Sequence, residues 1–298
     1  MKWFARFDRL ILVPPDSGRH PTADVSTSKG KTLNQQTAAV PTDIQKSGTR
    51  LRLLSYNIQV GIETKRAHHY FLHGWKHFIP HTRRFHNLDL VAEQVQGYDV
   101  VGLQEVDAGS LRSNFINLTE YIADKAKFPF WHHRINRRLG NIAQHSSGML
   151  FRIKPSEIKV HKLPALIPGR GVCMARFGNK DESLVVFNIH LSLSRRARGK
   201  QLGFIADLAQ EYDHVVMMGD LNTSPNSPEM KHLFRTTSLI EPLDAFHTFP
   251  SWQPSLHLDH ILVSSELKVH DAKVLSHSFS DHLPIAMEIE VPEGVKLR

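Results

Sequence analysis

The stretch from Val215 to Asn222 reads VVMMGDLN, an apolar run that ends in a glycine, a carboxylate and an amide. A short apolar run bounded by turn residues predicts a buried strand. Burying a polar group without a partner costs about 2–7 kcal/mol, so Asp220 and Asn222 need partners from elsewhere in the chain. The stretch therefore predicts a sheet-containing fold with a polar site at the end of one strand.

The same pattern recurs along the chain, where an acid, an amide or an imidazole lies at the edge of an apolar run. One such residue is readily explained as a cap or a turn, but six separate occurrences are not. The economical interpretation is that the strand ends converge and that their polar groups surround an ion or a ligand. Besides Asp220 and Asn222, the residues concerned are Asn57, Glu105, His190, Asp259, Asp281 and His282.

Strand and helix patterns alternate through residues 51–291. We predict strands over residues 51–58, 99–103, 149–153, 172–177, 184–191, 214–218, 260–264, 268–275 and 284–291, and helices over 68–78, 87–96, 114–127 and 200–212. The strands and helices lack a regular βαβ rhythm near the end, which favours mixed sheets over one parallel sheet.

Residues 1–50 differ in composition from the rest and predict an N-terminal arm and flexible linker ahead of a domain over 51–298. The apolar run at 10–13 is too short for a signal peptide, and no stretch approaches the roughly 20 apolar residues of a membrane span. Packing of the first fifteen residues on the main domain is the favoured interpretation. The alternative is that these residues form a basic, weakly amphipathic segment that binds an anionic membrane surface.

The single cysteine, Cys173, excludes an intramolecular disulfide and a thiolate zinc site, and it suits a cytoplasmic protein. The formal net charge is +8, which weakly indicates an anionic partner. Half of this charge lies in residues 1–50, so the predicted domain carries only about +4. Because one cysteine cannot form a thiolate site, any metal must be held by oxygen or imidazole ligands. Glu105 is the best candidate ligand for Mg²⁺, with Asn57 and Asp281 completing or supporting the shell, and Mn²⁺ is the alternative ion.

Seven blocks resemble, in order, the motifs of the endonuclease/exonuclease/phosphatase superfamily of DNase I-like, metal-dependent phosphohydrolases. They are LRLLSYNIQVG (51–61), VVGLQEVD (100–107), SGMLFR (147–152), VVFNIHLS (185–192), VVMMGDLN (215–222), LDHILVS (258–264) and FSDHLPIAMEI (279–289). The stretch TFPSW at 248–252 resembles a bacterial subset of that family. The resemblance implies a four-layer α/β sandwich, in which two mixed β-sheets pack face to face with helices outside.

The resemblance also implies the role of each site residue. Glu105 corresponds to the principal metal ligand, and Asn57 and Asp281 lie in or beside the metal site, where Asn57 also contacts the substrate. Asp220 orients the attacking water and Asn222 holds the phosphate. Asp259 orients His282, and His190 is the second imidazole at the phosphate, which stabilises charge or protonates the leaving oxygen. Together they imply hydrolysis of a phosphate ester by in-line attack of water.

The substrate is less constrained than the reaction. His190 and Gln59 depart from the branch that resembles abasic-site endonucleases. Arg195 and Arg196 directly follow the His190 block and are candidate contacts to a phosphate backbone, with a solvated helix start as the equal alternative. A second basic cluster consists of Arg134, Arg137 and Arg138. The histidines spaced by four within 68–86 predict a basic surface beside the site. We predict a nuclease-like phosphodiesterase first. A phospholipid or small-molecule phosphodiesterase or phosphatase at the inner membrane is the second hypothesis, and a non-catalytic binding module is the third.

Overall fold

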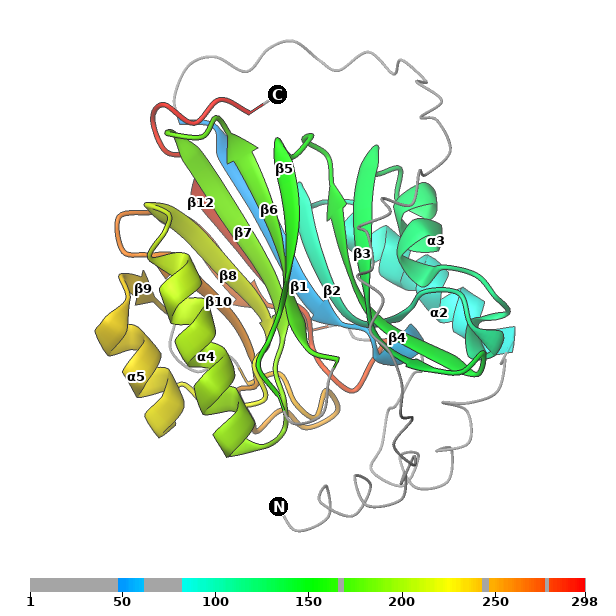
Figure 1. Cartoon of the computed structure of the whole chain (residues 1–298). Helices are drawn as coiled ribbons and strands as arrows, with labels where there is room; N and C mark the ends of the chain where they lie inside the picture. The colour runs from blue at the N-terminus through cyan, green and yellow to red at the C-terminus, as the bar shows by residue number, and fades with distance from the viewer. Residues whose placement is uncertain (1–47, 62–81, 166–168, 243–246, 277–278, 298) are drawn as a thin grey trace, which may run out of the picture. The chain divides into compact units, whose positions relative to one another are not determined.

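Two six-stranded sheets form the centre of the protein, as seen in a computed structural model (Figure 1). The structure describes residues 48–61, 82–165, 169–242, 247–276 and 279–297. The expectations for the N-terminal arm, for the helix at 68–78 and for most of the histidine-rich segment lie outside these residues. All described residues belong to one unit, Ile44–Arg298.

The first sheet has the strand order β11-β12-β1-β2-β4-β3. Its strands are β1 (Arg50–Asn57), β2 (Val100–Asp107), β3 (Phe130–Leu139), β4 (Ala143–Phe151), β11 (Val269–Val274) and β12 (Ile285–Glu290). β1 and β2 are parallel and the other neighbours are antiparallel, so the sheet is mixed.

The second sheet has the strand order β5-β6-β7-β8-β10-β9. Its strands are β5 (Glu157–Lys162), β6 (Gly171–Gly178), β7 (Ser183–His190), β8 (His214–Asp220), β9 (Leu239–Ile240) and β10 (Asp259–Ser264). Only β7 and β8 run parallel in this sheet, and both are buried almost throughout.

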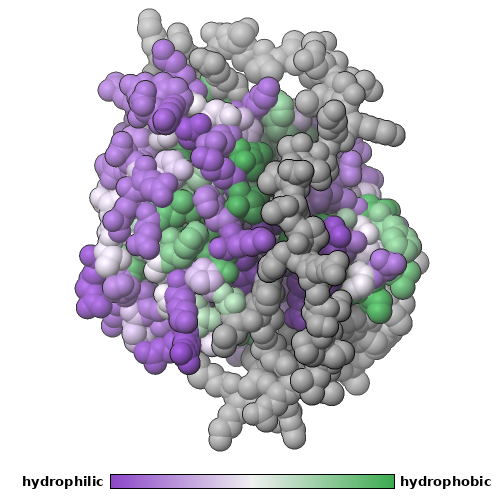
Figure 2. All heavy atoms as spheres, viewed as in Figure 1, coloured by the Kyte–Doolittle hydropathy of each residue, from purple (hydrophilic) through white to green (hydrophobic). Residues whose placement is uncertain are grey.

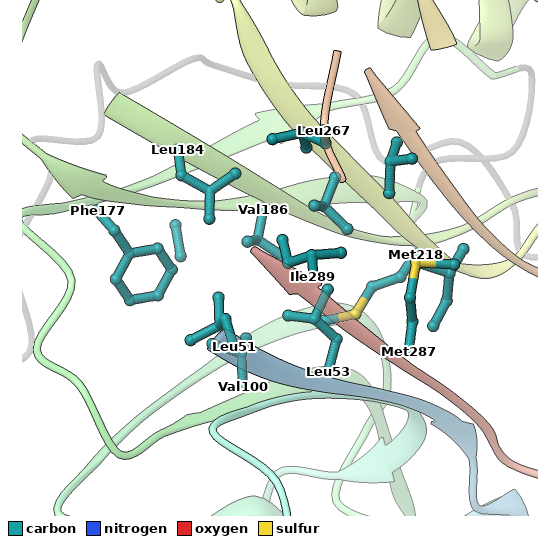
Figure 3. Close-up of a cluster of buried hydrophobic side chains, with 14 of the residues drawn as sticks. Leu51, Leu53, Val100, Phe177, Leu184, Val186, Met218, Leu267, Met287 and Ile289 are labelled. Carbon is teal, nitrogen blue, oxygen red and sulfur yellow. The ribbon is translucent and has the colours of Figure 1, made fainter. Parts of the chain in front are cut away.

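Three apolar clusters define four layers. The central one fills the space between the sheets, with Leu53 and Met287 from the first sheet against Val186 and Met218 from the second (Figure 3). A second cluster packs helices α4 (Arg195–Ala209) and α5 (Pro228–Thr236) on the second sheet, and a third packs α2 (Thr82–Val95) and α3 (Leu118–Lys125) on the first. This arrangement confirms the predicted four-layer α/β sandwich.

The helices begin where their caps place them. In α3 the Asn117 side chain accepts hydrogen bonds from the backbone of Thr119 and Glu120, so the helix begins at Leu118 and not at 114. In α5 the Ser227 side chain caps the backbone N–H of Met230, and Pro228 occupies the first turn. The predicted helix at 87–96 begins earlier, at Thr82, and the one at 200–212 is α4.

Sequence reasoning missed β3, β5, β9 and α5. β3 reads FWHHRINRRL, in which polar and basic residues occupy both faces, so the alternation that indicates a strand is hidden. Two short 3₁₀ turns, η2 (Gln59–Gly61) and η4 (Leu111–Ser113), follow β1 and β2. On the face seen in Figure 2, hydrophilic side chains cover most of the described surface, with apolar side chains in smaller groups between them. No helix among the described residues is long and apolar enough to cross a membrane.

Candidate functional site

Neighbouring strands bring the sequence-predicted polar residues together at one end of both sheets. In the second sheet His190 pairs in register with Asp220, and Asp220 pairs with Asp259 on the other side. In the first sheet Asn57 ends β1 opposite Gln104, the residue before Glu105. Both sheets thus deliver their polar strand ends to one cluster, and all of its members except Glu105 and Asn222 are buried.

Asp220 is the centre of this cluster. Its Oδ2 accepts a hydrogen bond from Asn57 Nδ2 at 3.0 Å and lies 3.5 Å from His190 Nε2 and 3.9 Å from His282 Nε2. Burial, together with the nearby charges of Asp259 and Glu105, raises the pKa of Asp220 to about 7, against the lowering effect of His282. A carboxylate with a pKa near neutrality is suited to accept a proton from water.

His282 is oriented by Asp259. Its Nδ1 donates to Asp259 Oδ2 at 2.8 Å, and the Thr248 hydroxyl donates to the same oxygen. Burial alone would lower the pKa of His282, but Asp259 and Asp220 raise it well above its ordinary value. His282 is therefore a buried cation whose Nε2 faces Asp220.

His190 has the opposite charge preference. Burial lowers its pKa well below the ordinary value, and the charges of Arg170 and His282 lower it further. Its Nε2 lies 3.9 Å from Glu105 Oε1, so it joins the two sheets across the cluster. A neutral imidazole here supplies a hydrogen bond and not a charge.

Glu105 is the most accessible carboxylate of the site. The β2–β4 register shifts between Leu103 and Val106, and Glu105 within that bulge has φ of 53°. A bulge re-aims a side chain, and a positive φ in a residue other than glycine marks a conformation enforced by its surroundings. Its side chain is 38% exposed, against 3% for Asp220, so it faces the open side of the cluster.

Asp281 and Asn57 complete the first-sheet side. The Ser280 hydroxyl lies 2.7 Å from Asn57 O and 3.2 Å from Asp281 Oδ1, which ties the chain before β12 to the end of β1. Burial, together with the nearby charge of Glu105, raises the pKa of Asp281 to about 6 against the lowering effect of His282. Asn57 Oδ1 accepts from the Gln59 backbone N–H at 3.2 Å, which fixes its amide with Nδ2 toward Asp220.

Asn222 lies in a tight turn directly after β8. Its φ is 52°, its backbone N–H donates to Asp220 Oδ1 at 2.9 Å, and its Nδ2 donates to Leu191 O at 3.0 Å. The next residue is also held, because His260 Nε2 donates to Thr223 O at 2.8 Å. The turn therefore places Asn222 beside Asp220 and the end of β7.

Behind this turn lies a buried group of Glu241, His257 and His260, which sequence reasoning missed. Glu241 Oε1 lies 3.0 Å from His257 Nε2 and 2.9 Å from His260 Nδ1. The two rings stack at 4.3 Å with 17° between their planes, so one ion cannot lie in the plane of both. We interpret the group as a hydrogen-bonded ion pair that supports the turn, and not as a metal centre, although its ligand atoms lie close together.

Arg195 and Arg196 occupy the exposed first turn of α4. Arg195 Nε lies 3.6 Å from Glu229, which also accepts two hydrogen bonds from Arg198. The segment is thus the start of a helix, as the alternative interpretation of it expected. Substrate contact by Arg195 and Arg196 stays a prediction.

Two further polar groups that the motifs did not single out support the site. Gln104 Nε2 donates to Asn188 Oδ1 at 2.7 Å, and Asn188 Nδ2 donates to Gly148 O at 2.8 Å, which joins the two sheets beneath the cluster. The buried carboxylate of Asp107, two residues after Glu105, accepts from Arg112 Nε and from the backbone of Ser110. Both Gln104 and Asp107 lie inside the LQEVD block, but only the inter-strand contacts reveal what they hold.

The donor set fits a hard divalent cation. Glu105, Asp220, Asp259 and Asp281 gather in a small space, where burial first and the negative charge of Glu105 next raise the pKa values of Asp220 and Asp281. Asp220, Asp259 and His282 offer ligand atoms within 4.8 Å of one another, but Asp259 is already held by His282 and Thr248. Metal binding by Glu105, Asp281 and Asn57 stays a prediction.

Comparisons with known proteins agree with this geometry. Residues 54–282 match the model of the Endonuclease/Exonuclease/phosphatase family. A comparison with curated protein sequences found no match.

Solved structures show the same fold at low sequence identity. A family protein from Leptotrichia buccalis has a TM-score of 0.63 at 18% identity, with 80% of this chain and 99% of that chain covered. A mannosyl-6-phosphatase from Bacteroides thetaiotaomicron has a TM-score of 0.60 at 17% identity, with 80% and 99% covered. A humanized D. rerio TDP2 has a TM-score of 0.58 at 16% identity, with 81% and 99% covered. The chain belongs to the Endonuclease/Exonuclease/phosphatase family of phosphoester hydrolases.

Proposed function

We propose that the protein is a divalent-metal-dependent phosphodiesterase that cuts nucleic acid by in-line attack of water. The observation that carries the proposal is Asp220, a buried carboxylate oriented by Asn57 and flanked by a neutral and a cationic imidazole. Such a set can activate water on one side of a phosphorus atom and stabilise negative charge around it.

The roles of the protein's own groups follow from their charges. Asp220 accepts the proton of the attacking water, as its raised pKa of about 7 allows. The cationic His282, held by Asp259, stabilises the negative charge that develops on the phosphoryl oxygens. Asn222 Nδ2 donates a hydrogen bond to Leu191 O in this structure, and it donates to a phosphoryl oxygen in its place when substrate is bound.

His190 acts through a hydrogen bond. Because its pKa is lowered, the imidazole is neutral at neutral pH and has no proton to spare for the leaving oxygen. Stabilisation of charge by a hydrogen bond is therefore favoured over protonation of that oxygen. Glu105 and Asp281, with Asn57 beside them, would hold the metal ion. When bound, Mg²⁺ supplies positive charge that neutralises the phosphate and the leaving oxygen, and Mn²⁺ has the same preference for oxygen ligands.

Nucleic acid is proposed as the substrate because basic side chains lie beside the cluster. The charge of Arg170 acts on both His190 and His145, and the carbonyl of Arg170 accepts from Arg134. Phosphate contacts by arginine give most of the affinity in such complexes. The second candidate is a phosphate ester of a lipid or small molecule, which is favoured by the modest charge of about +4 on residues 51–298.

The test offers the purified full chain four substrates, namely plasmid DNA, a single-stranded oligonucleotide, phospholipid vesicles and bis-p-nitrophenyl phosphate. Each is incubated with Mg²⁺, with Mn²⁺ and with EDTA. Nicking or oligonucleotide cleavage that EDTA abolishes supports the proposal. Headgroup release from vesicles with intact plasmid and oligonucleotide would refute the nucleic-acid substrate in favour of the second candidate.

A further inference from the structure

Arg134 lies on β3 at the edge of the first sheet, on the side of the site away from α4 and α5. It pairs in register with Ser147 of β4, and the neighbouring Ser146 pairs with Val106 of β2, next to Glu105. Two strand spacings, about 10 Å, therefore separate the backbones of Arg134 and Glu105. The arginine flanks the catalytic cluster without being part of it.

The side chain of Arg134 crosses from the first sheet to the second. A Cβ built on Gly171 would lie 1.4 Å from Arg134 Nη1, so the guanidinium rests directly on the start of β6. β6 is the neighbour of β7, and Val172 pairs with Ile189, the residue before His190. The guanidinium thus lies on the strand next to β7, which ends in His190, and the two strands are roughly 5 Å apart.

The charge of this guanidinium is not matched by an acid. Arg134 Nη1 donates to Asn136 Oδ1 at 3.2 Å and Nη2 donates to Arg170 O at 3.4 Å, and both acceptors are neutral. Within the described part of the chain no carboxylate forms an ion pair with Arg134. Arg134 is half-buried, and this burial lowers its pKa. A half-buried cation with only neutral partners gains most from an anionic ligand, because hydrogen bonds to charged groups contribute more.

The surroundings hold Arg134 in place. Asn136 Nδ2 donates to Ser147 Oγ at 2.9 Å, so the acceptor that positions Nη1 is itself fixed. Gly169, with φ of +128°, lets the chain before β6 pack against Asn136 O. Arg170 lies between Gly169 and Gly171 and adds a second positive charge close to His190.

We propose that Arg134, together with Arg170, forms a binding subsite for a second phosphate of the substrate, adjacent to the phosphate that is cut. The inference rests on the proposed function, since it places a multiply phosphorylated substrate across β2, β4, β3 and β6. It assigns the subsite to the β3 side of the cluster, opposite Arg195 and Arg196 on α4. A substrate with one phosphate would leave this subsite empty.

The test measures binding without turnover. The full chain in EDTA is titrated against a fluorescein-labelled 12-mer oligonucleotide, and its affinity is followed by anisotropy at several salt concentrations. Arg134→Gln is expected to weaken binding by about tenfold or more and to make the log–log salt slope shallower by about 0.7. The matched control is Arg138→Gln on the same strand, whose exposed side chain should change affinity less than twofold.

Two further variants separate a local role from a folding defect. Arg134→Lys keeps the charge but loses the forked geometry, so it should fall between wild type and Arg134→Gln. Gly171→Ala leaves Arg134 in the chain but displaces its guanidinium, so it should weaken binding like Arg134→Gln. Circular dichroism and the thermal midpoint confirm that each variant is folded. Equal effects of Arg134→Gln and Arg138→Gln would overturn the inference.

A small-molecule arm distinguishes failure of the inference from failure of the proposed function. If the wild type binds no oligonucleotide, fructose 1,6-bisphosphate is used as the probe in a thermal-shift titration. Stabilisation that Arg134→Gln removes would support the subsite and contradict the nucleic-acid substrate. Binding of either probe that is indifferent to Arg134, or of neither probe, would contradict the subsite itself.

Discussion

At the scale of single residues, the site works by giving chemically similar side chains different charges. His190 and His282 lie on either side of Asp220, yet one has a lowered pKa and the other a raised one. The difference comes from Asp259, which contacts His282 at 2.8 Å, whereas Arg170 and His282 act on His190 as positive charges. The assignment of roles in the proposed reaction depends on this asymmetry.

Asp259→Asn tests the source of the charge on His282. We expect the pKa of His282, followed by NMR in EDTA, to fall toward its ordinary value, because the negative partner is replaced by a neutral one. We expect kcat on bis-p-nitrophenyl phosphate to fall by roughly 10²–10⁴. The control is Asp271→Asn, an exposed aspartate on β11. An unchanged pKa of His282 would contradict the account.

Cys173 tests the packing between the sheets. Its side chain is 2% exposed within the central cluster, and burial raises the pKa of its thiol to about 12. We expect no reaction with DTNB in the folded protein at pH 8, and full reaction in 6 M guanidinium chloride. Modification within seconds under native conditions would show that the core near β6 is open.

At the scale of elements, the residues of the site lie at the ends of strands, and the turns that follow the strands position their side chains. β7 and β8 are parallel neighbours that approach closely at Gly219, where φ is +145° and a Cβ would lie 1.9 Å from Ile189 O. Only glycine fits this approach, which places Asp220 level with His190.

Gly219→Ala is therefore expected to cost stability as well as activity. The added methyl group must push β7 and β8 apart or force the backbone out of its conformation, at a cost of roughly 2–4 kcal/mol. Chemical unfolding in urea measures this loss. Gly203→Ala in α4, where a Cβ meets no atom within 4 Å, is the control and should be neutral or slightly stabilising. Equal stabilities of the two variants would refute the close-approach argument.

Glu241 supports the turn after β8 through His260, which donates to Thr223 O. Burial would raise the pKa of Glu241, but the hydrogen bonds from His257 and His260 outweigh it and lower the pKa to about 2. The group therefore stabilises the fold above its unfolded pKa of 4.5, and this contribution is lost as pH falls through about 2.

Glu241→Gln is expected to destabilise the protein by about 3 kcal/mol at pH 6, because a buried cation loses its partner. The difference from wild type should shrink by about 2 kcal/mol at pH 3, since each pH unit below 4.5 removes about 1.4 kcal/mol. Urea unfolding at both pH values measures this. Glu211→Gln, at an exposed residue, is the control. A difference that is independent of pH would contradict the ion pair.

At the scale of the whole molecule, the sequence predicted the four-layer architecture and the buried strands better than the exposed strands at the edges of the sheets. The buried strands were found because apolar runs such as VVMMGD are unambiguous, and their polar ends pointed to one cluster. β3 was missed because a solvent-facing edge strand has no apolar face to reveal it. The sequence did not decide whether a helix starts at α4's first turn, because Arg195, Arg196 and Arg198 are polar and lie before the first buried position, Gln201.

The site divides in the same way. The proximity of the polar strand ends was predictable because each residue interrupts or ends an apolar pattern. These residues are Asn57, Glu105, His190, Asp220, Asp259, Asp281 and His282. Arg134, Arg170, Glu241 and His257 come from loops and from an edge strand, and pairing between distant segments places them beside or behind the cluster. No spacing in the sequence records such pairing, so their placement required the structure.

The most direct measurement of the central claim is the rate of bis-p-nitrophenyl phosphate hydrolysis by the wild type and by Asp220→Asn. We predict hydrolysis by the wild type with Mg²⁺ or Mn²⁺, none with EDTA, and a fall of at least about 10³ in kcat for Asp220→Asn with its thermal midpoint retained. Arg138→Gln should keep the wild-type rate. A wild-type rate in folded Asp220→Asn, or hydrolysis that persists in EDTA, would contradict the account.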